Sequence, residues 1–302
     1  MAKLNVWLRA VRIRFLLASI ISVCLGLAIN GWQNKTFDLE FAILTFVGVA
    51  ALHASVDLLN DYWDYKRQID TETQRTKFSG GTGVLPEGLL EPKQVYRAGM
   101  MMLIIGSVIG AFFIFERGIT IAIILGFAIV SIYFYSTRIV DSGLGEIFVA
   151  IKGAMIVLGA YFVQSSHITL EPIIAGIVSG ILSSTVLFVN SFPDFDADKK
   201  HGRKTLVILL GKQRAASIVW IFPIITYGVI GISVITGIFP FICLITFVTI
   251  PMSVRLGVSL KKNYENLEKL VPVMQGFVTY GRITGTLFVI AFVLDLFLKN
   301  LQ

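Results

Sequence analysis

Nine long apolar runs occupy most of the 302-residue chain, and they restrict the possible folds more than any other feature. Each is close to the length of about 20 residues that a helix needs to cross a lipid bilayer. Lipid offers no hydrogen-bond partners to the backbone, so each run is expected to be helical. The runs cover residues 14–32, 41–60, 97–115, 119–136, 143–164, 172–192, 215–236, 238–259 and 279–298. The sequence therefore predicts an all-α, polytopic membrane protein with nine transmembrane helices.

The composition excludes a water-soluble protein. Only 15% of the residues are charged and 55% are hydrophobic, whereas soluble domains carry roughly 25% charged residues. Cys24 and Cys243 both lie in apolar runs, so we expect no disulfide framework.

Lysine and arginine residues are distributed unevenly between the connecting segments. They gather in the N-terminal segment and after the second, sixth and eighth runs, whereas the opposite segments carry only Lys35, Arg117 and Lys299. Cytoplasmic segments of membrane proteins are enriched in these residues. We therefore expect a cytoplasmic N-terminus and two cytoplasmic polar loops, at about 61–95 and 193–213, that cap one end of the helices. The basic residues are scattered over several loops, so no nucleic-acid partner is expected.

Two acidic segments, residues 57–70 and 190–200, each follow an apolar run and enter one of these loops. Asn60 and Asp64 are four residues apart, and so are Asn190 and Asp194. Residues at this spacing project from one face of a helix. Asp57 extends the first stripe, and Asp198 extends the second if the helix continues through Pro193.

Carboxylates gathered at a membrane helix end repel one another and need a positive partner. The side chains offer oxygen ligands without nearby histidine or cysteine, a set that suits a hard cation such as Mg²⁺. Two facing stripes could hold two ions with a diphosphate bridging them. The other possibility is that these are ordinary solvated acids beside a membrane surface.

At these residues the chain resembles the UbiA superfamily of intramembrane prenyltransferases. Asn60, Asp61 and Asp64 match the first acidic motif of that family, and Asp194 and Asp198 match the second. Residues 202–206 and Gly211 also resemble its second-loop signature. The resemblance implies a single domain over residues 1–302, with nine helices around a central cavity. It also implies a location in the cell membrane, with the active site facing the cytoplasm.

The first motif departs from the common family pattern at Gln68, where a third aspartate usually stands, and an acid follows instead at Asp70. This spacing, with Tyr62 and Tyr65, resembles the 1,4-dihydroxy-2-naphthoate branch, which makes menaquinone precursors. Residues 80–85 and 143–146 resemble the same branch.

Near the N-terminus, Trp7 and Arg12 fit the family's opening, although Ile13 replaces the usual proline.

The resemblance implies Mg²⁺-dependent transfer of a prenyl group from a polyprenyl diphosphate to an aromatic acceptor, with release of diphosphate. Two Mg²⁺ ions would be held by Asn60, Asp64, Asp194 and Asp198, with Asp61 and Asp70 as further ligand candidates. The expected catalytic residues are those first four and Tyr135, whose ring would face the allylic cation. The expected substrate-binding residues are Arg12, Lys66, Arg67, Tyr133, Arg138, Lys152, Asn190 and Lys204.

Several of these residues have an equally ordinary explanation. Basic residues in these loops follow the positive-inside rule, and tyrosines near helix ends are common at membrane interfaces. Lys152 lies inside an apolar run and could extend toward the interface, pair with Glu146 or reach the cavity. The Gly80–Gly83 loop could be a phosphate cradle or simply flexible. His53, His167 and His201 show no ligand spacing and are expected to be non-catalytic.

Three alternative functions stay open at this point. Within the family, the acceptor could be 4-hydroxybenzoate or a glycerophosphate lipid precursor. The third alternative is an ion-coupled transporter, although transporters place such residues near the bilayer midplane rather than at the helix ends.

Overall fold

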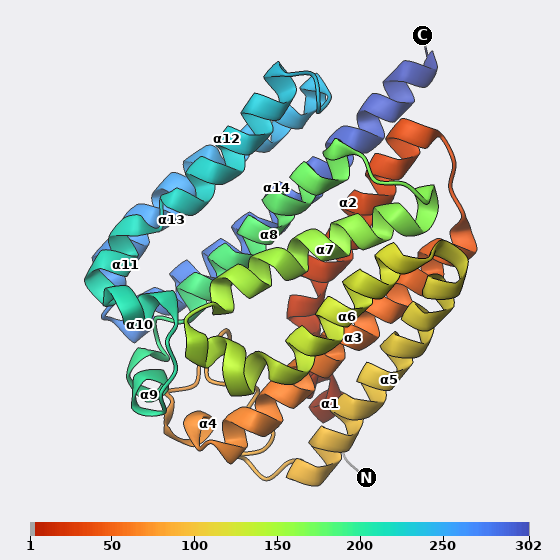
Figure 1. Ribbon diagram of the computed structural model, residues 1–302. Coiled ribbons are helices and arrows are strands. Elements are labelled where there is room, and N and C mark those ends of the chain that lie inside the picture. The colour runs from red at the N-terminus through yellow and green to blue at the C-terminus, as the bar shows by residue number, and fades with distance from the viewer. Residues whose placement is uncertain (1–3, 302) are drawn as a thin grey trace.

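The computed structural model describes residues 4–301, and within that range nine helical spans are long and apolar enough to cross a membrane (Figure 1). They are Ile13–Asn34, Leu39–Lys66, Pro92–Arg117, Ile119–Ser142, Gly145–Ser165, Leu170–Asn190, Lys212–Ile235, Phe241–Asn263 and Leu267–Leu301. Every regular element in the described chain is helical. The predicted all-α fold and the predicted number of spans are thereby confirmed.

Six spans are single helices and three are composite. The single ones are α2 (Ile13–Asn34), α3 (Leu39–Lys66), α5 (Pro92–Arg117), α7 (Gly145–Ser165), α8 (Leu170–Asn190) and α14 (Leu267–Leu301), which contains Pro272. The fourth span joins α6 (Ile119–Phe134) to a π-helical turn, η1 (Tyr135–Ile139), and a 3-10 turn, η2 (Val140–Ser142). The seventh span is α11 (Lys212–Ile218) followed by α12 (Ile221–Ile235), and the eighth is η3 (Phe241–Thr249) followed by α13 (Ile250–Asn263).

Local chemistry explains where the helices begin and end. The Asp38 carboxylate accepts a hydrogen bond from the Phe41 N–H at 2.9 Å and so caps the start of α3. Pro92 opens α5, where its missing N–H costs nothing. The sixth span ends at Asn190, because Pro193 cannot donate to the preceding turn and clashes with it. The continuous stripe that would carry Asp198 on the same helix therefore does not form.

The short helices gather at one end of the bundle (Figure 1). They are α1 (Leu4–Ala10), α4 (Ile69–Glu72), α9 (Phe195–Lys200) and α10 (Leu206–Leu210). An ion pair between Lys200 and Glu72, 2.8 Å long, joins the two polar loops there. The described chain begins at this end and finishes at the opposite one, as an odd number of spans requires. Which side of a membrane this end faces stays a prediction from the positive charges.

The spans enclose a cavity of about 350 Å³. Helix α7 packs against α8 and α2, α14 packs against α2 and α8, and α3 packs against α5. The largest buried cluster lies among α8, α12, η3 and α14, and includes Phe188, Phe277 and Phe292. The cavity is bounded by α2, α3, α6, α7, α8 and α14, and its lining extends to Asp70 of α4 and Asp198 of α9. The bundle thus places a partly apolar chamber directly beneath the two acidic segments.

Glycines bring α7 and α8 into backbone contact. An added Cβ at Gly180 would lie 2.1 Å from the Ala150 carbonyl oxygen, so the close approach requires glycine there. Gly228, in α12, has no neighbouring atom within 4 Å of the same position.

We predict that Gly180→Ala lowers stability by about 1–3 kcal/mol, because the methyl group forces the two backbones apart. Gly228→Ala is the control, because it brings the same gain in helix propensity without a clash. Thermal unfolding of both variants in detergent checks the prediction. Equal midpoints for the two variants would show that the α7–α8 contact is looser than described.

Candidate active site

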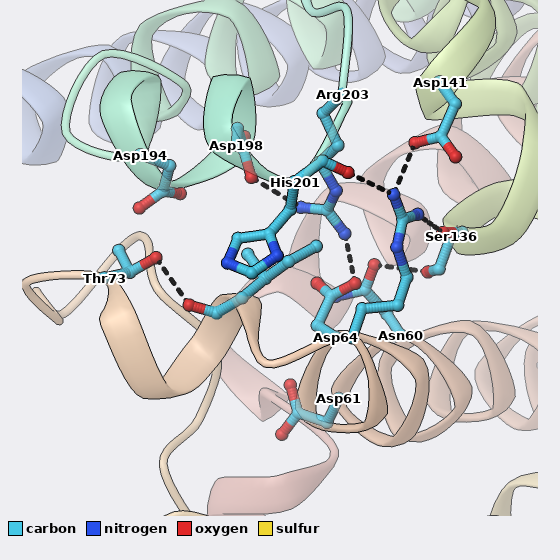
Figure 2. Close-up of polar contacts among 12 residues, drawn as sticks. Asn60, Asp61, Asp64, Thr73, Ser136, Asp141, Asp194, Asp198, His201 and Arg203 are labelled. Carbon is cyan, nitrogen blue, oxygen red and sulfur yellow. Dashed lines mark hydrogen bonds and ion pairs between the residues drawn. The ribbon is translucent and has the colours of Figure 1, made fainter.

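The polar end of the cavity holds a buried arginine between two carboxylates from distant parts of the chain (Figure 2). Asp64 lies in the last turn of α3, Asp198 lies in α9, and Arg203 follows α9. The Arg203 guanidinium donates to Asp198 at 3.0 Å and also to Asp64. Both aspartates are only 3% exposed, so leaving either charge unpaired would be costly. The two acidic segments therefore converge in space, although 134 positions separate Asp64 from Asp198.

Asn60 is held in place from two sides. Its side-chain oxygen accepts a hydrogen bond from the Ser136 hydroxyl at 2.7 Å, and its amide donates to Asp64 at 2.9 Å. Ser136 belongs to η1, so the π-helical turn of the fourth span orients a group on α3. Wide turns of this kind are frequent at functional sites.

Arg67 ties three segments together just outside the cavity. It donates to the Ser136 carbonyl at 2.6 Å, to Asp141 at 3.0 Å and to the His201 carbonyl at 2.9 Å. The end of α3, the turn before α7 and the end of α9 are thus fastened at one point. Arg67 therefore supports the site rather than lining it.

The glycine loop of residues 80–83 lies over two further acids. The Gly80 N–H donates to the Asp194 carboxylate at 3.3 Å. Gly81 has a φ of +69°, and an added Cβ there would overlap the Asp70 carboxylate. Glycine is needed at this position for both reasons.

Burial makes these acids reluctant to ionise. It raises the pKa of Asp194 to about 8, with the charge of Asp198 adding to the rise and Arg203 opposing it. Burial and the charges of Asp64 and Asp61 likewise raise the pKa of Asp70 to about 8. More negative charge is gathered here than the arginines offset, so the site favours an additional cation.

The donor atoms fit Mg²⁺. One side-chain oxygen each of Asn190 and Asp194 is buried and has no hydrogen-bond partner within residues 4–301. Asn60 and Asp64 add oxygens on the opposite wall. In the described part of the chain, no three carboxylate, imidazole or thiolate groups form a complete protein cage for a metal. Mg²⁺ does not need one, because it commonly takes one or two carboxylates and fills its shell with water and phosphate oxygens.

The chain matches a known protein family. The profile of the UbiA prenyltransferase family matches residues 16–294, nearly the whole chain. This chain belongs to the UbiA prenyltransferase family. It is therefore a prenyltransferase, an enzyme rather than a transporter.

Two kinds of relatives support the assignment. A 1,4-dihydroxy-2-naphthoate octaprenyltransferase from Bacillus subtilis is 28% identical over 245 residues, which cover 80% of this chain and 77% of that protein. A Haemophilus influenzae protein of the same name is 28% identical over 224 residues, which cover 70% of this chain and 71% of that protein. A UbiA homologue from Archaeoglobus fulgidus, solved with DMAPP and Mg²⁺, shares the fold with a TM-score of 0.66 at 15% identity, covering 92% of this chain and 98% of that one.

Most of the residues expected from the UbiA motifs lie at the cavity, and the others do not. Those lining it are Arg12, Asn60, Asp64, Asp70, Tyr135, Lys152, Asn190, Asp194 and Asp198. Those placed elsewhere are Asp61, Lys66, Arg67, Tyr133, Arg138 and Lys204.

Asp61 faces away from the other carboxylates (Figure 2). It pairs with Arg12 at 2.6 Å and accepts a hydrogen bond from the Thr82 N–H at 3.3 Å. The expectation that Asp61 is a metal ligand does not fit this placement, because Asp61 does not line the cavity that the other acids share. The residue instead fastens the N-terminal segment and the glycine loop to α3.

Helix geometry explains why three of the expected substrate contacts lie at the surface. Lys66 and Tyr133 are each two positions from a cavity residue, Asp64 and Tyr135, and residues two apart do not share a face. Arg138 follows the cavity residue Tyr135 by three positions. It is exposed because residues three apart do not share a face in the wider π-helical turn.

Lys204 is also exposed, while the preceding residue, Arg203, points inward. The sequence did not identify Arg203 as a site residue, because the positive-inside rule accounts equally well for every basic residue in that loop.

We predict that Arg203→Gln reduces kcat/KM by about 10²–10³-fold, the usual cost of removing a group that stabilises developing negative charge. Lys200→Gln serves as the control, because Lys200 lies on α9 nearby but pairs at the exposed surface. Steady-state assays of prenyl transfer check both variants. Full activity in Arg203→Gln would show that the buried pair is structural only.

Proposed function

We propose that this UbiA-family enzyme transfers a prenyl group from a polyprenyl diphosphate to 1,4-dihydroxy-2-naphthoate in menaquinone biosynthesis, with release of diphosphate. The observation that carries the proposal is the convergence of Asp64 and Asp198 on one buried cation at the mouth of a largely apolar cavity. The names of the Bacillus and Haemophilus relatives support the choice of acceptor.

The diphosphate would lie at the acidic end of the cavity. Asn60, Asp64, Asp194 and Asp198 would hold two Mg²⁺ ions, and the UbiA homologue solved with DMAPP and Mg²⁺ supports a requirement for magnesium. Bound magnesium supplies positive charge that stabilises the leaving diphosphate. Arg203 contributes a fixed charge of the same sign, which costs no reorganisation during the reaction.

The allylic carbon would lie below Tyr135, whose ring lines the cavity beyond the acids. An aromatic face stabilises a nearby cation by about 0.5–2 kcal/mol. Apolar side chains line the deeper chamber, including Val49, Leu52 and Ile156, and keep water from the reactive carbon. The same three residues also border a second, almost wholly apolar pocket of about 120 Å³ between α3, α5, α6 and α7, which suits the remainder of a long prenyl tail.

Two other acceptors, 4-hydroxybenzoate and a glycerophosphate lipid precursor, share the same ionisation step. The spacing of Asp64, Gln68 and Asp70 resembles the 1,4-dihydroxy-2-naphthoate branch of the family and therefore favours the naphthoate as the acceptor. We propose further that the protein lies in the cell membrane with its acidic end toward the cytoplasm, because the basic residues concentrate in the loops at that end.

We predict that purified enzyme with Mg²⁺ and polyprenyl diphosphate prenylates the dihydroxynaphthoate in preference to the other two acceptors. Mass spectrometry of the products and measurement of released diphosphate check this outcome. Removal of Mg²⁺ with EDTA is expected to abolish turnover, and added Mg²⁺ is expected to restore it. Preference for 4-hydroxybenzoate or the glycerophosphate would contradict the assigned acceptor.

Asp194→Ala is expected to retain less than about 1% of wild-type turnover, because it removes a ligand used in the transition state. Asp196→Ala is the matched control, because Asp196 lies two residues away with a side chain that is 84% exposed. Both variants are assayed at saturating Mg²⁺ after their thermal midpoints are shown to match. Undiminished activity in Asp194→Ala would rule out its role in metal binding.

A further inference from the structure

Three ionisable side chains line the cavity below the acidic end and have no part in binding the diphosphate. They are His53 and Asp57 on α3 and Lys152 on α7. Asp57 precedes Asp64 by seven residues, which is about 10 Å along a helix. His53 and Asp57 therefore lie deeper in the bundle than the carboxylates of the metal site, and Lys152 lies seven residues after the start of α7. Ionisable groups inside a membrane span are expensive and usually mark a ligand or ion site.

One ring nitrogen of His53 is held by a hydrogen bond, and the other faces the Asp57 carboxylate without a hydrogen bond. The Ser19 hydroxyl lies 2.8 Å from Nδ1 and fixes the orientation of the ring. The other nitrogen, Nε2, is 3.4 Å from Asp57 Oδ2, and neither atom has a hydrogen-bond partner within residues 4–301. The side chains of His53 and Asp57 are only 9% and 14% exposed. A buried polar atom without a partner costs free energy, so this pair is arranged for a polar ligand.

Lys152 lines the same cavity from α7. Among the described residues it forms no salt bridge, and the partner considered from the sequence, Glu146, accepts a hydrogen bond from the Leu206 N–H at 3.0 Å instead. The cavity therefore presents one ammonium group together with a histidine and a carboxylate. Within residues 4–301, no other lysine lines this chamber.

We propose that His53, Asp57 and Lys152 form the binding site for the polar substituents of the acceptor ring. Lys152 pairs with a carboxylate on the ring, while Asp57 and His53 Nε2 accept hydrogen bonds from its hydroxyl groups. The chemistry selects a hydroxylated aromatic acid, held between the allylic carbon and the base of the cavity. This inference rests on the proposed prenyl transfer, and it assigns the three side chains to binding and positioning.

The test compares two acceptors that differ only in the carboxylate, 1,4-dihydroxy-2-naphthoate and 1,4-dihydroxynaphthalene. Lys152→Met is expected to raise KM for the carboxylated acceptor at least 10-fold and to leave KM for the other acceptor within 2-fold. KM for the polyprenyl diphosphate is expected to stay unchanged. Lys152→Arg should restore most of the affinity, and Lys261→Met is the control, because Lys261 is exposed near the end of α13.

His53→Ala and Asp57→Asn are expected to raise KM for both acceptors, because the two acceptors carry the same hydroxyl groups that these side chains bind. A merely structural role of Lys152 would lower the thermal midpoint without separating the two acceptors, and a merely structural role of His53 or Asp57 would also change KM for the polyprenyl diphosphate. If Lys152→Met does not fold, KM for the two acceptors is compared in Lys152→Gln instead, because glutamine keeps a polar end without the charge.

The outcomes separate this inference from the proposed function. Wild-type enzyme that prenylates neither naphthalene acceptor would overturn the proposed acceptor, and the inference with it. Active wild-type enzyme together with an unchanged preference for the carboxylated acceptor in Lys152→Met and Lys152→Gln would overturn the inference alone.

Discussion

The pairing of Arg203 with Asp64 and Asp198 is the interaction on which the rest of the site depends. It joins the end of α3 to the segment after α8, and these are the two halves from which the site is built. Charges buried to this degree are stable only when each has a partner. The pair therefore fixes the distance between the halves, and with it the width of the entrance to the cavity.

Around this pair, the protein separates two kinds of chemistry along one axis. The outer end gathers acids, arginines and backbone N–H groups, which suit a diphosphate and its metal ions. The inner chamber is mostly apolar, so an allylic cation formed there meets Tyr135 and few water molecules. The Ser136 hydroxyl holds Asn60 between these zones, and Arg67 in turn donates to the Ser136 carbonyl, so the orientation of a ligand group depends on the turn before α7.

Much of this organisation could be predicted from the sequence, because the bilayer imposes strong rules. Apolar length determines the number of spans, and the matched spacing of Asn60–Asp64 and Asn190–Asp194 indicates two related sites. The choice among nearby cations could not be predicted, because the positive-inside rule places many of them in the same loops. The position of His53 on the cavity wall could not be predicted either. The spacing of residues along one helix does not show which of its faces lines a cavity.

The close contact between α7 and α8 has a further consequence for how this fold can adapt. Gly153, Gly176 and Gly180 bring the two backbones into direct contact, so no side chain between them can repack. This wall of the cavity therefore cannot adjust to a bulkier substrate. Relatives that accept larger substrates are therefore expected to differ on the side of α3, α5 and α6, where side chains rather than backbones form the boundary of the cavity.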